Sequence, residues 1–497
     1  MILAAGAAAT VIVWHWPQRS QQHTNLDLAK VGLATAGTVA LWCLLFSRLP
    51  WKIRLITLAT GLLAVGALAA TLRVRGVDGN LVPIVEWRWK SQTMAPIKPG
   101  ATTTGVSPPE GAADFPQFLG PARTGVLAGP DLAVDWSAQP PVPLWRRPVG
   151  LGWSGFAVAG GVAVTQEQRE SEEGVAAYEL ATGRPLWWHG DPVRFTSTLA
   201  GDGPRATPTI AGSRVFTLGS TGIVNCLDLV TGRRIWGKDL IREAGGRQPD
   251  WGYAGSPLVM DDLVVVNPGA GEGRGLMACA IDDGSVRWTG GTGSPSYSSP
   301  LLAALGESRQ ILLFGSALTG HDAATGASLW SFPWPGGHPH VAMPVQVSAT
   351  DWVLSSGYGT GSGRISVTRD AAGTWSAREV WRTNRLKSKF SNPVLHRGHL
   401  YGLDDGVLAC LDADSGELKW RDGKYGHGQV LLIGARLLVM AEKGDVALVD
   451  PHPDALRELT RFPALSGKTW NPPALAGEYL LVRNDAEAAC YRLPLAR

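Results

Sequence analysis

Hydrophobic positions along the chain follow two patterns: unbroken apolar runs near the N-terminus and short alternating segments after it. Residues 31–47 and 55–72 are apolar almost throughout and carry no charge. Each has about the 17–25 residues that a helix needs to cross a bilayer. We therefore predict two transmembrane helices. A soluble, buried helical hairpin is the alternative, but neither run offers a polar face that would meet water.

The segment between these two runs, residues 47–54, contains a helix-breaking proline, a tryptophan and three basic residues. Because basic loops stay on the cytoplasmic side, this segment predicts a helical hairpin that returns the chain to the far side of the membrane. A third apolar run, residues 1–14, is short for a span and predicts a further short membrane helix. A cleaved signal peptide is its alternative, although the basic start of such a signal is missing.

A change of composition separates the predicted membrane region, residues 1–75, from the rest of the chain. Residues 76–113 include a stretch after position 91 that is rich in Pro, Gly, Thr and Ala and has no periodicity. Such composition is typical of a linker between domains. We therefore place the domain boundary at residue 114.

From residue 114 onward the chain repeats a β-hairpin pattern, in which an apolar strand and a tight turn lead to a second strand that ends on tryptophan. The clearest copies are residues 226–236, 320–330 and 409–420. Asp bonds the backbone of the turn, and Gly supplies its positive φ. We expect the closing aromatic side chains to fill the space between neighbouring units; they are Trp145, Trp187, Trp236, Trp288, Trp330, Trp381 and Trp420, with Phe462 as a degenerate copy.

The repeat recurs at a period of roughly 45 residues, which is typical of a radial or linear array. Its two ends are incomplete in complementary ways. Residues 144–149 form an aromatic strand with no first strand before it, and residues 489–493 form a first strand with no aromatic strand after it. Pairing these two strands would close the array into a ring and leave no exposed sheet edge.

A second phrase, made of small residues and proline, opens each unit and occurs eight times, for example at 298–302 and 391–395. Small residues and proline suit a strand that lies beside an axis and is paired on one side only. We therefore predict an all-β fold, an eight-bladed β-propeller over residues 114–497, preceded by transmembrane helices.

Charge argues against a nucleic-acid-binding protein, and the positions of the cysteines argue against disulfide bonds. The net charge of the 497 residues is +3, so electrostatics gives no case for binding nucleic acid. Cys43 lies in a predicted membrane helix. The other four cysteines occupy equivalent positions in different units, too far apart for the roughly 4.4–6.8 Å Cα separation of a disulfide. We therefore predict packed free thiols at Cys226, Cys279, Cys410 and Cys490.

The hairpin that ends on tryptophan resembles the repeat of the PQQ-binding-like, or quinoprotein-like, β-propeller family. The segment 115–125 looks like the one that precedes such propellers in membrane-anchored bacterial members. The resemblance covers roughly residues 114–497 and implies the propeller fold. One branch of the family consists of quinoprotein dehydrogenases that hold PQQ and Ca²⁺ at the mouth of the funnel. Another is a scaffold lipoprotein of the outer-membrane assembly machinery, which binds protein partners without catalysis.

The dehydrogenase branch carries a vicinal Cys-Cys pair against the quinone, and carboxylate and Asn metal ligands near a catalytic Asp. This sequence has no Cys-Cys pair, no carboxylate in its unit-opening phrases and no Cys-x-x-Cys-His motif for haem. We therefore expect a non-catalytic binding or scaffold module for protein or small ligands, with no catalytic residue and no assigned cofactor. A dehydrogenase of alcohols or sugars that holds PQQ with Ca²⁺ in a divergent site is the alternative.

Aromatic and basic residues stand immediately before the axial strands and are expected around one mouth of the funnel. There they can bind an anionic or planar ligand by stacking and charge-assisted hydrogen bonds. Alternatively, the aromatic rings pack between blades and the cations are solvated. These residues are Trp153, Arg205, Tyr253, Tyr297, His340, Lys389, Phe390 and Trp470.

Three further motifs give weaker signals. His338 and His340 suggest a metal, but no third ligand is in view. The Gly-rich segment 267–275 lacks the Lys-Ser/Thr and the helix of a phosphate loop and predicts a hairpin connection. The basic segment 384–389 is expected to be a solvated loop. Together these features predict an inner-membrane protein with its propeller on the periplasmic side, whose partners are the membrane and a protein or small ligand at the propeller face.

Overall fold

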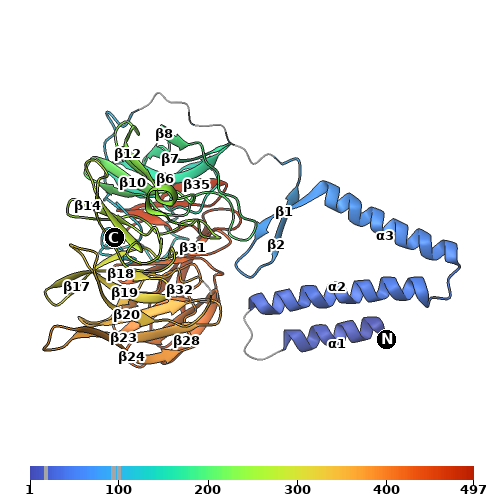
Figure 1. Ribbon diagram of the computed structural model, residues 1–497. Helices are drawn as coiled ribbons and strands as arrows, with labels where there is room; N and C mark the ends of the chain where they lie inside the picture. The colour runs from blue at the N-terminus through green and yellow to red at the C-terminus, as the bar shows by residue number, and fades with distance from the viewer. Residues whose placement is uncertain (16–20, 91–93, 95–96, 98–101, 338, 497) are drawn as a thin grey trace. The chain divides into compact units, whose positions relative to one another are not determined.

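The computed structural model describes residues 1–15, 21–90, 94, 97, 102–337 and 339–496. They form two compact units, a helical N-terminal one and a β-rich C-terminal one. Figure 1 shows the first in blue and the strands of the second in cyan to red.

The N-terminal unit contains three helices and one β-hairpin (Figure 1). Its second and third helices are each long and apolar enough to cross a membrane, and its first helix is a shorter apolar one. Pro50 precedes the third helix, as a residue with fixed φ and no N–H does at a helix start. The elements are α1 (Ile2–Trp14), α2 (Gln21–Leu45), α3 (Trp51–Thr71), β1 (Leu72–Val77) and β2 (Pro83–Trp87).

Helix α2 begins at Gln21, well before the predicted start at residue 31. Most of the additional residues are polar, and some of them pair along the helix surface. Gln21 Nε2 donates to Asn25 Oδ1 at 3.0 Å, and Lys30 Nζ lies 3.0 Å from Asp27 Oδ1. Side chains three or four positions apart stabilise a helix beyond its apolar stretch, which hydrophobicity alone does not reveal.

The segment predicted as a linker, 76–113, is not irregular throughout. It begins inside the β1–β2 hairpin, whose strands pair antiparallel. Further on, Thr103 N donates to Val230 O at 2.9 Å, and Glu478 N donates to Gly111 O at 3.2 Å. Residues 102–113 therefore pack on the propeller through backbone hydrogen bonds, which composition gave no reason to expect.

Eight antiparallel four-stranded sheets form the propeller, and one of them has an additional parallel strand. The prediction of an eight-bladed all-β propeller is confirmed. The first strands of neighbouring blades lie beside one another around the axis. Blades 1 to 4 are β5 (Ala157–Ala159), β6 (Val162–Arg169), β7 (Glu172–Glu179), β8 (Pro185–Asp191); β9 (Thr209–Ala211), β10 (Arg214–Leu218), β11 (Ile223–Asp228), β12 (Arg234–Asp239); β13 (Leu258–Met260), β14 (Leu263–Val266), β15 (Leu276–Ala280), β16 (Val286–Gly290); and β17 (Leu301–Leu305), β18 (Ser308–Phe314), β19 (Ala317–Asp322), β20 (Ser328–Pro333).

The remaining blades follow the same order, and a short helix, α4 (Leu240–Ala244), follows β12. Blades 5 to 8 are β21 (Val345–Gln346), β22 (Asp351–Ser356), β23 (Gly361–Arg369), β24 (Trp375–Thr383); β25 (Val394–His396), β26 (His399–Asp404), β27 (Val407–Asp412), β28 (Leu418–Lys424); β3 (Val126–Leu127), β29 (Gln429–Ile433), β30 (Arg436–Met440), β31 (Asp445–Asp450), β32 (Arg457–Pro463); and β33 (Ala474–Ala476), β34 (Tyr479–Arg483), β35 (Glu487–Arg492), β4 (Val142–Pro148).

The eighth blade combines strands from both ends of the propeller sequence. β35 pairs antiparallel with β4, and Cys490 is the register partner of Trp145. Arg146 and Glu487 add an ion pair of 3.4 Å between the same two strands. The pairing covers the outer side of β35 and gives β4 a sheet partner, which matters because unpaired edges invite association with other chains.

The tryptophan of one blade packs on the turn glycine of the next. Trp187 Nε1 donates to Leu229 O at 2.9 Å, and its ring lies against Gly232, where a Cβ atom would stand 2.5 Å from the indole. Gly232 also has a φ of 69°, so the glycine serves both the turn and the neighbouring indole. The same contact joins Trp145 to Gly183, Trp236 to Gly284, Trp288 to Gly326 and Trp381 to Gly416.

Blade 4 departs from this scheme. Trp330 Nε1 donates to Gln310 Oε1 of its own blade at 2.7 Å. Trp334, which the repeat pattern did not single out, reaches blade 5 instead and donates from Nε1 to Ser356 Oγ at 2.9 Å. Blade 5 has no Asp-x-x-Thr-Gly turn to receive the indole, so a residue outside the repeat makes the contact.

The degenerate position Phe462 keeps an aromatic role between blades 7 and 8. Its ring lies edge-on to Tyr491 at 4.9 Å and to Trp136 at 5.3 Å. The phenyl ring of Phe462 is smaller than an indole, and Trp136, from the segment before β4, packs beside it.

The five cysteines are all free thiols, as predicted for the four in the blades. Those four are buried among apolar side chains. Burial raises the pKa of Cys226 to about 12 and that of Cys279 to about 11. Thiols that stay protonated at neutral pH are poor nucleophiles, so these cysteines pack rather than react.

Candidate functional site

The residues expected around the funnel mouth fall into several groups, and three of them form one aromatic cluster. The rings of Trp153 and Trp470 lie 5.0 Å apart, and those of Phe390 and Trp470 lie 4.7 Å apart. Lys468 Nζ lies 4.4 Å from the ring centroid of Trp153 and 4.1 Å from that of Trp470. The aromatic faces are therefore in contact with one another and with a cation.

Hydrogen bonds fix this cluster to the neighbouring blades. Trp470 Nε1 donates to Glu442 Oε1 at 2.7 Å, and the same carboxylate accepts from His427 N at 3.0 Å. Gln429 Nε2 donates to the carbonyl oxygens of Phe390 and Trp470, at 2.8 and 2.7 Å. Burial, with a contribution from nearby Lys389, lowers the pKa of His427 to about 3, so this imidazole is neutral.

Arg205 and Tyr297 form a second group. The guanidinium of Arg205 lies 4.7 Å from the ring centroid of Phe195 and donates to Ser220 Oγ at 3.4 Å. Tyr297 Oη accepts from Trp251 N at 3.1 Å, and the two rings are 5.4 Å apart. Burial lowers the pKa of Arg205 to about 10, yet the group keeps its positive charge at neutral pH.

Lys389 belongs to the same region but is buried, with 3% of its surface exposed. Its Nζ lies 5.1 Å from the ring centroid of Tyr358. Lys387 Nζ lies 2.5 Å from Asp404 Oδ1. The expectation of a solvated basic loop at 384–389 is therefore wrong for these two lysines, because each is held against the blades by an aromatic ring or a carboxylate.

Tyr253 and His340 lie in the packing of the blades. Tyr253 is 1% exposed and donates from its hydroxyl to Pro268 O at 3.2 Å. His340 stacks on Phe314 with ring centroids 5.0 Å apart, and its Nδ1 is 2.9 Å from Ser356 Oγ. His338, the other half of the suggested metal motif, lies outside the described residues.

A planar quinone with Ca²⁺ requires an open aromatic face and a set of oxygen ligands. The faces of Trp153, Phe390 and Trp470 already contact one another or Lys468, so a quinone would have to separate packed rings. Within the ranges that the structure describes, no group of three or more His, Cys, Asp or Glu side chains could hold a metal ion. These residues do not fit the cofactor, and no reaction step is assigned to them.

A second site lies farther along the inner strands, where residues 115–127, here called the lead-in segment, run beside the axis. Phe115 and Val158 exchange two backbone hydrogen bonds of 2.9 and 2.8 Å. Ile210 N donates to Pro116 O at 2.7 Å. The lead-in segment thus adds its backbone to the first strands of blades 1 and 2.

The lead-in segment also joins blades 3 and 7. β3 pairs parallel with β29 of blade 7. The guanidinium of Arg123, 3% exposed, donates to the carbonyl oxygens of Ser256 and Pro257 in blade 3, at 2.9 and 2.8 Å. Burial lowers the pKa of Arg123 to about 9. A cation held in this way fastens the segment to the inner wall of the ring.

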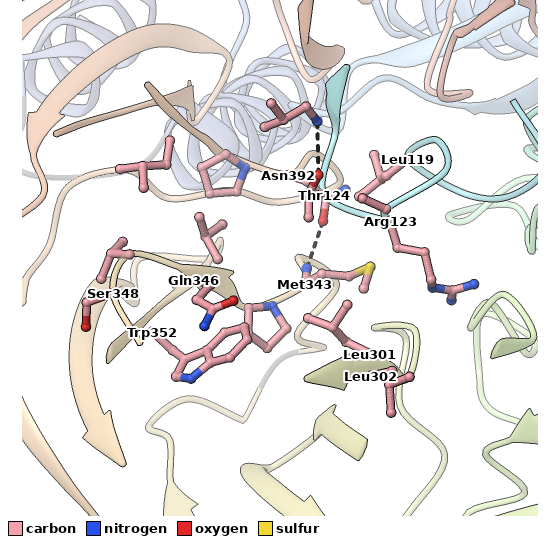
Figure 2. A pocket seen from close by; sticks show the side chains of 17 residues that line it. Leu119, Arg123, Thr124, Leu301, Leu302, Met343, Gln346, Ser348, Trp352 and Asn392 are labelled. Carbon is pink, nitrogen blue, oxygen red and sulfur yellow. Dashed lines mark hydrogen bonds between the residues drawn. The ribbon is translucent and has the colours of Figure 1, made fainter. Parts of the chain in front are cut away.

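The first strands of blades 4, 5 and 6 enclose a pocket of about 540 Å³ beside the lead-in segment. Figure 2 shows its lining, in which Leu119 and Thr124 come from the lead-in segment and face side chains of the blades. Asn392 Oδ1 accepts from Met343 N at 2.7 Å and so joins two of the walls. The lining is mostly apolar and includes Leu119, Leu301, Leu302, Met343, Trp352 and Leu395.

Sequence reasoning did not find this pocket. The available signals were the apolar residues of the lead-in segment, Phe115, Phe118 and Leu119, which a simple linker does not need, and the arginine among them. The opposite wall comes from three separate blades, and no local pattern connects them.

Comparison with known proteins agrees with this architecture. The sequence profile of the family described as outer membrane protein assembly factor BamB matches residues 136–303, 171–421 and 314–470. The chain is 24% identical over 364 residues to outer membrane protein assembly factor BamB of Yersinia pestis, covering 70% of this chain and 77% of that protein. It is 26% identical over 259 residues to the factor of the same name in Moranella endobia, covering 49% of this chain and 62% of the relative, less than two thirds of its length.

Solved structures share the fold at low sequence identity. BamB from Moraxella catarrhalis superposes with a TM-score of 0.50 at 15% identity, covering 71% of this chain and 100% of that one. A europium-containing methanol dehydrogenase superposes with a TM-score of 0.55 at 14% identity, covering 76% of this chain and 90% of that one. Quinohemoprotein alcohol dehydrogenase from Comamonas testosteroni superposes with a TM-score of 0.52 at 12% identity, covering 78% of this chain and 81% of that one. Because the profile matches run from residue 136 to residue 470, the chain belongs to the family of PQQ-like repeat propellers described as outer membrane protein assembly factor BamB.

Proposed function

We propose that the protein is a membrane-held, periplasm-facing propeller that binds partner proteins without catalysis and takes part in the assembly of envelope proteins. The observation that carries this proposal is the apolar pocket at the axis, bounded on one side by the lead-in segment. Its lining is mainly aliphatic, aromatic and amide groups, which suit the binding of a partner, and its Thr124 and Ser348 hydroxyls have no His, Asp, Glu, Cys or Lys beside them in the lining to act as a base. The names of the Yersinia and Moranella relatives, both assembly factors, support the same class of function.

The membrane attachment rests on α2 and α3. Both are long and apolar enough to span a bilayer, and their connection is basic, with Arg48 in the loop and Lys52 and Arg54 in the first turn of α3. Basic loops remain in the cytoplasm, which directs the chain after α3 to the opposite side. A scaffold fixed in this way stays close to the membrane surface on which its partners emerge.

The catalytic alternative is tested with the full chain reconstituted in lipid nanodiscs. Calorimetric titration with PQQ, with and without Ca²⁺, is combined with a dye-reduction assay on alcohols and sugars. We expect no saturable, metal-dependent heat and no dye reduction. Tight Ca²⁺-dependent binding together with dye reduction would overturn the proposal in favour of a dehydrogenase.

The assembly role is tested by deleting the gene from the bacterium that encodes the chain. Quantitative proteomics of the outer membrane should show a fall in its β-barrel proteins, and the full chain should restore them. A chain lacking residues 1–90 but carrying a cleavable secretion signal tests the anchor, and we expect it to restore them less well. Unchanged barrel protein levels in the deletion strain would contradict the assembly role.

A further inference from the structure

Backbone groups of the first strands alternate between the next strand and the axis. In an antiparallel pair, the two residues beside a two-residue turn bond each other, and the residue before them directs its N–H and C=O to the opposite edge. In blade 2, Ala211 pairs with Arg214 beside such a turn, so Ile210 faces the axis. The amide of Ile210 is the one that donates to Pro116 of the lead-in segment.

The same geometry holds in blades 1 and 7, the two other blades whose first strands bond the backbone of the lead-in segment. Val158 precedes Ala159, which pairs with Val162 beside the turn of blade 1. Leu432 precedes the corresponding pair in blade 7, and its amide donates to Gly125 O at 2.8 Å. The chain therefore recognises an extended segment of itself through an axis-facing backbone position in each of these blades, and in blade 7 Gly434 N adds a second bond, to Leu127 O.

Blades 5 and 6 present this position inside the pocket. Leu395 precedes His396, which pairs with His399 beside a two-residue turn. In blade 5, Val347 N donates to Asp351 O of the hairpin at 2.9 Å, so by alternation Gln346 faces the axis. Both Gln346 and Leu395 line the pocket.

Blade 4 supplies a third position of the same kind. Leu305 pairs with Ser308 beside the turn, so alternation places Leu302 on the axis-facing edge, and Leu302 lines the pocket as well. β17, β21 and β25 are edge strands within the described part of the chain, each with one sheet neighbour. Three consecutive blades thus present axis-facing backbone groups beside the apolar side chains that line the pocket.

We propose that this pocket binds an extended, mainly apolar peptide segment of a partner protein, which adds its backbone to the axis-facing edges of blades 4 to 6. This inference rests on the proposed function and names the mode of binding. The pocket continues the interface that the lead-in segment already occupies beside it, and Leu119, Thr124 and Val126 of that segment form the shared wall. The occupant would complete the ring of backbone contacts that the chain itself begins at blades 7, 1 and 2.

The chemistry of the pocket indicates the character of the peptide. Strand addition takes its affinity from main-chain hydrogen bonds and its preference from alternate side chains. Here the side chains that point inward would meet Leu301, Met343 and Trp352, whereas the intervening ones would point away. The lining contains no carboxylate, and its one cation, Arg123, is already bonded to blade 3. An uncharged sequence that alternates apolar and polar residues therefore fits best.

The test uses a fluorescein-labelled heptapeptide of alternating leucine and threonine and the full chain in nanodiscs. Fluorescence anisotropy should show saturable binding. Gln346→Pro removes the axis-facing N–H without removing a blade hydrogen bond, and Gln346→Ala is its matched control, which keeps that N–H. We expect Gln346→Pro to weaken binding about three- to tenfold and Gln346→Ala to leave it within about twofold, as the net value of one backbone hydrogen bond indicates.

Two further measurements keep the proposal falsifiable if Gln346→Pro unfolds. The pair Leu395→Pro and Leu395→Ala repeats the comparison in blade 6. A heptapeptide N-methylated at alternate amides retains the side chains but loses donors, and it should bind more weakly to the unaltered chain. Equal binding of the methylated and unmethylated peptides, or equal effects of proline and alanine, would overturn recognition through the backbone.

A photo-crosslinking amino acid in place of Leu302 distinguishes the possible occupants in cells. Crosslinks to an uncharged, alternating segment of another protein support the proposal, whereas crosslinks within the chain or to a second copy would overturn it. If barrel proteins fall in the deletion strain but the peptide does not bind, this inference fails and the proposed function stands. If the peptide binds but barrel proteins are unaffected, the pocket assignment survives and the assembly role fails.

Discussion

Trp145 and Cys490 are register partners in blade 8, although one lies near the beginning of the propeller sequence and the other near its end. The indole also reaches the next blade, where Trp145 Nε1 donates to Leu180 O at 2.8 Å. One residue therefore links the closing strand pair to blade 1. The closure makes the stability of the whole ring depend on both termini of the propeller.

Truncation after Asp485 should destabilise the whole propeller, because it removes β35, exposes the edge of β34 and leaves β4 without its sheet partner. Losing the packing of one large aromatic residue alone costs on the order of 3–5 kcal/mol, against a typical total of about 5–15 kcal/mol. Limited proteolysis and circular dichroism should show a protease-sensitive or aggregated domain. Truncation after Leu493 keeps β35 and serves as the control. A stable core of seven blades would contradict closure as the source of stability.

Gly232→Ala should destabilise the propeller more than Gly212→Ala does. Both glycines have positive φ, 69° and 57°, so both variants carry a similar backbone strain of about 1–2 kcal/mol. A Cβ at Gly232 would stand 2.5 Å from the indole of Trp187, whereas a Cβ at Gly212 meets nothing within 4 Å. Urea unfolding should therefore show a further loss of about 1–3 kcal/mol for Gly232→Ala. An equal loss of unfolding free energy in the two variants would mean that the Trp187 ring moves aside without an energetic penalty.

Arg123→Ala should loosen the lead-in segment. The substitution leaves the carbonyl oxygens of Ser256 and Pro257 without their buried donor, and hydrogen bonds to a charged group are worth about 1.5–3 kcal/mol each. The desolvation of the arginine offsets part of this, so we expect a net loss of roughly 2 kcal/mol in urea unfolding and faster protease cleavage within residues 115–127. Arg309→Ala, which removes a half-exposed ion pair with Asp261, should change stability by less than about 1 kcal/mol. Unchanged cleavage in Arg123→Ala would contradict the fastening role.

The buried imidazole of His427 should make the propeller less stable in mild acid. Its pKa falls from 6.5 to about 3 on folding, so below pH 6.5 the unfolded chain takes up a proton that the folded chain does not. The contribution is complete above pH 6.5 and declines by up to about 1.4 kcal/mol per pH unit as the pH falls toward 3. Comparing urea unfolding of the unaltered chain and His427→Gln at pH 7 and pH 5 isolates this effect.

The comparison is needed because burial raises the pKa of Glu173 and Asp405, which opposes the histidine at acidic pH. Those carboxyl groups are present in both proteins, so their contribution cancels in the difference. The stability lost between pH 7 and pH 5 should be smaller in His427→Gln. An equal loss in both proteins would show that the imidazole is protonated when folded.

The orientation of the membrane region predicts the compartment of a reporter. Alkaline phosphatase joined after Trp89 should be active, because that enzyme matures only outside the cytoplasm and the basic loop 47–54 is expected inside it. Changing Arg48, Lys52 and Arg54 together to Asn should reduce this activity. An active cytoplasmic reporter, such as green fluorescent protein, at the same position would contradict the orientation.

The blade count, the hairpin turns and the apolar helices could be read from sequence because each depends on residues that are close together along the chain. The repeat at 409–420 contains the Asp and Gly that its turn needs, and α3 contains the run of apolar residues that a membrane helix needs. The start of α2 was missed because its first residues pair through polar side chains. The contact of Trp334, in place of Trp330, with blade 5 was missed, because it depends on the residues that the adjacent blade presents to the indole.

The eight-bladed architecture follows from the sequence, because each repeat forms its hairpin from residues that are close together along the chain. The side-chain and backbone contacts at the axis, in contrast, depend on how the blades are arranged in space. There Trp153 and Phe390 both pack against Trp470, and the lead-in segment lies along blades 7, 1 and 2. The pocket beside that segment brings together Leu302, Gln346 and Leu395, which lie in three successive blades. The closing strand pair itself could be predicted from the complementary ends at 144–149 and 489–493, whereas the contacts at the axis join residues that no local pattern connects.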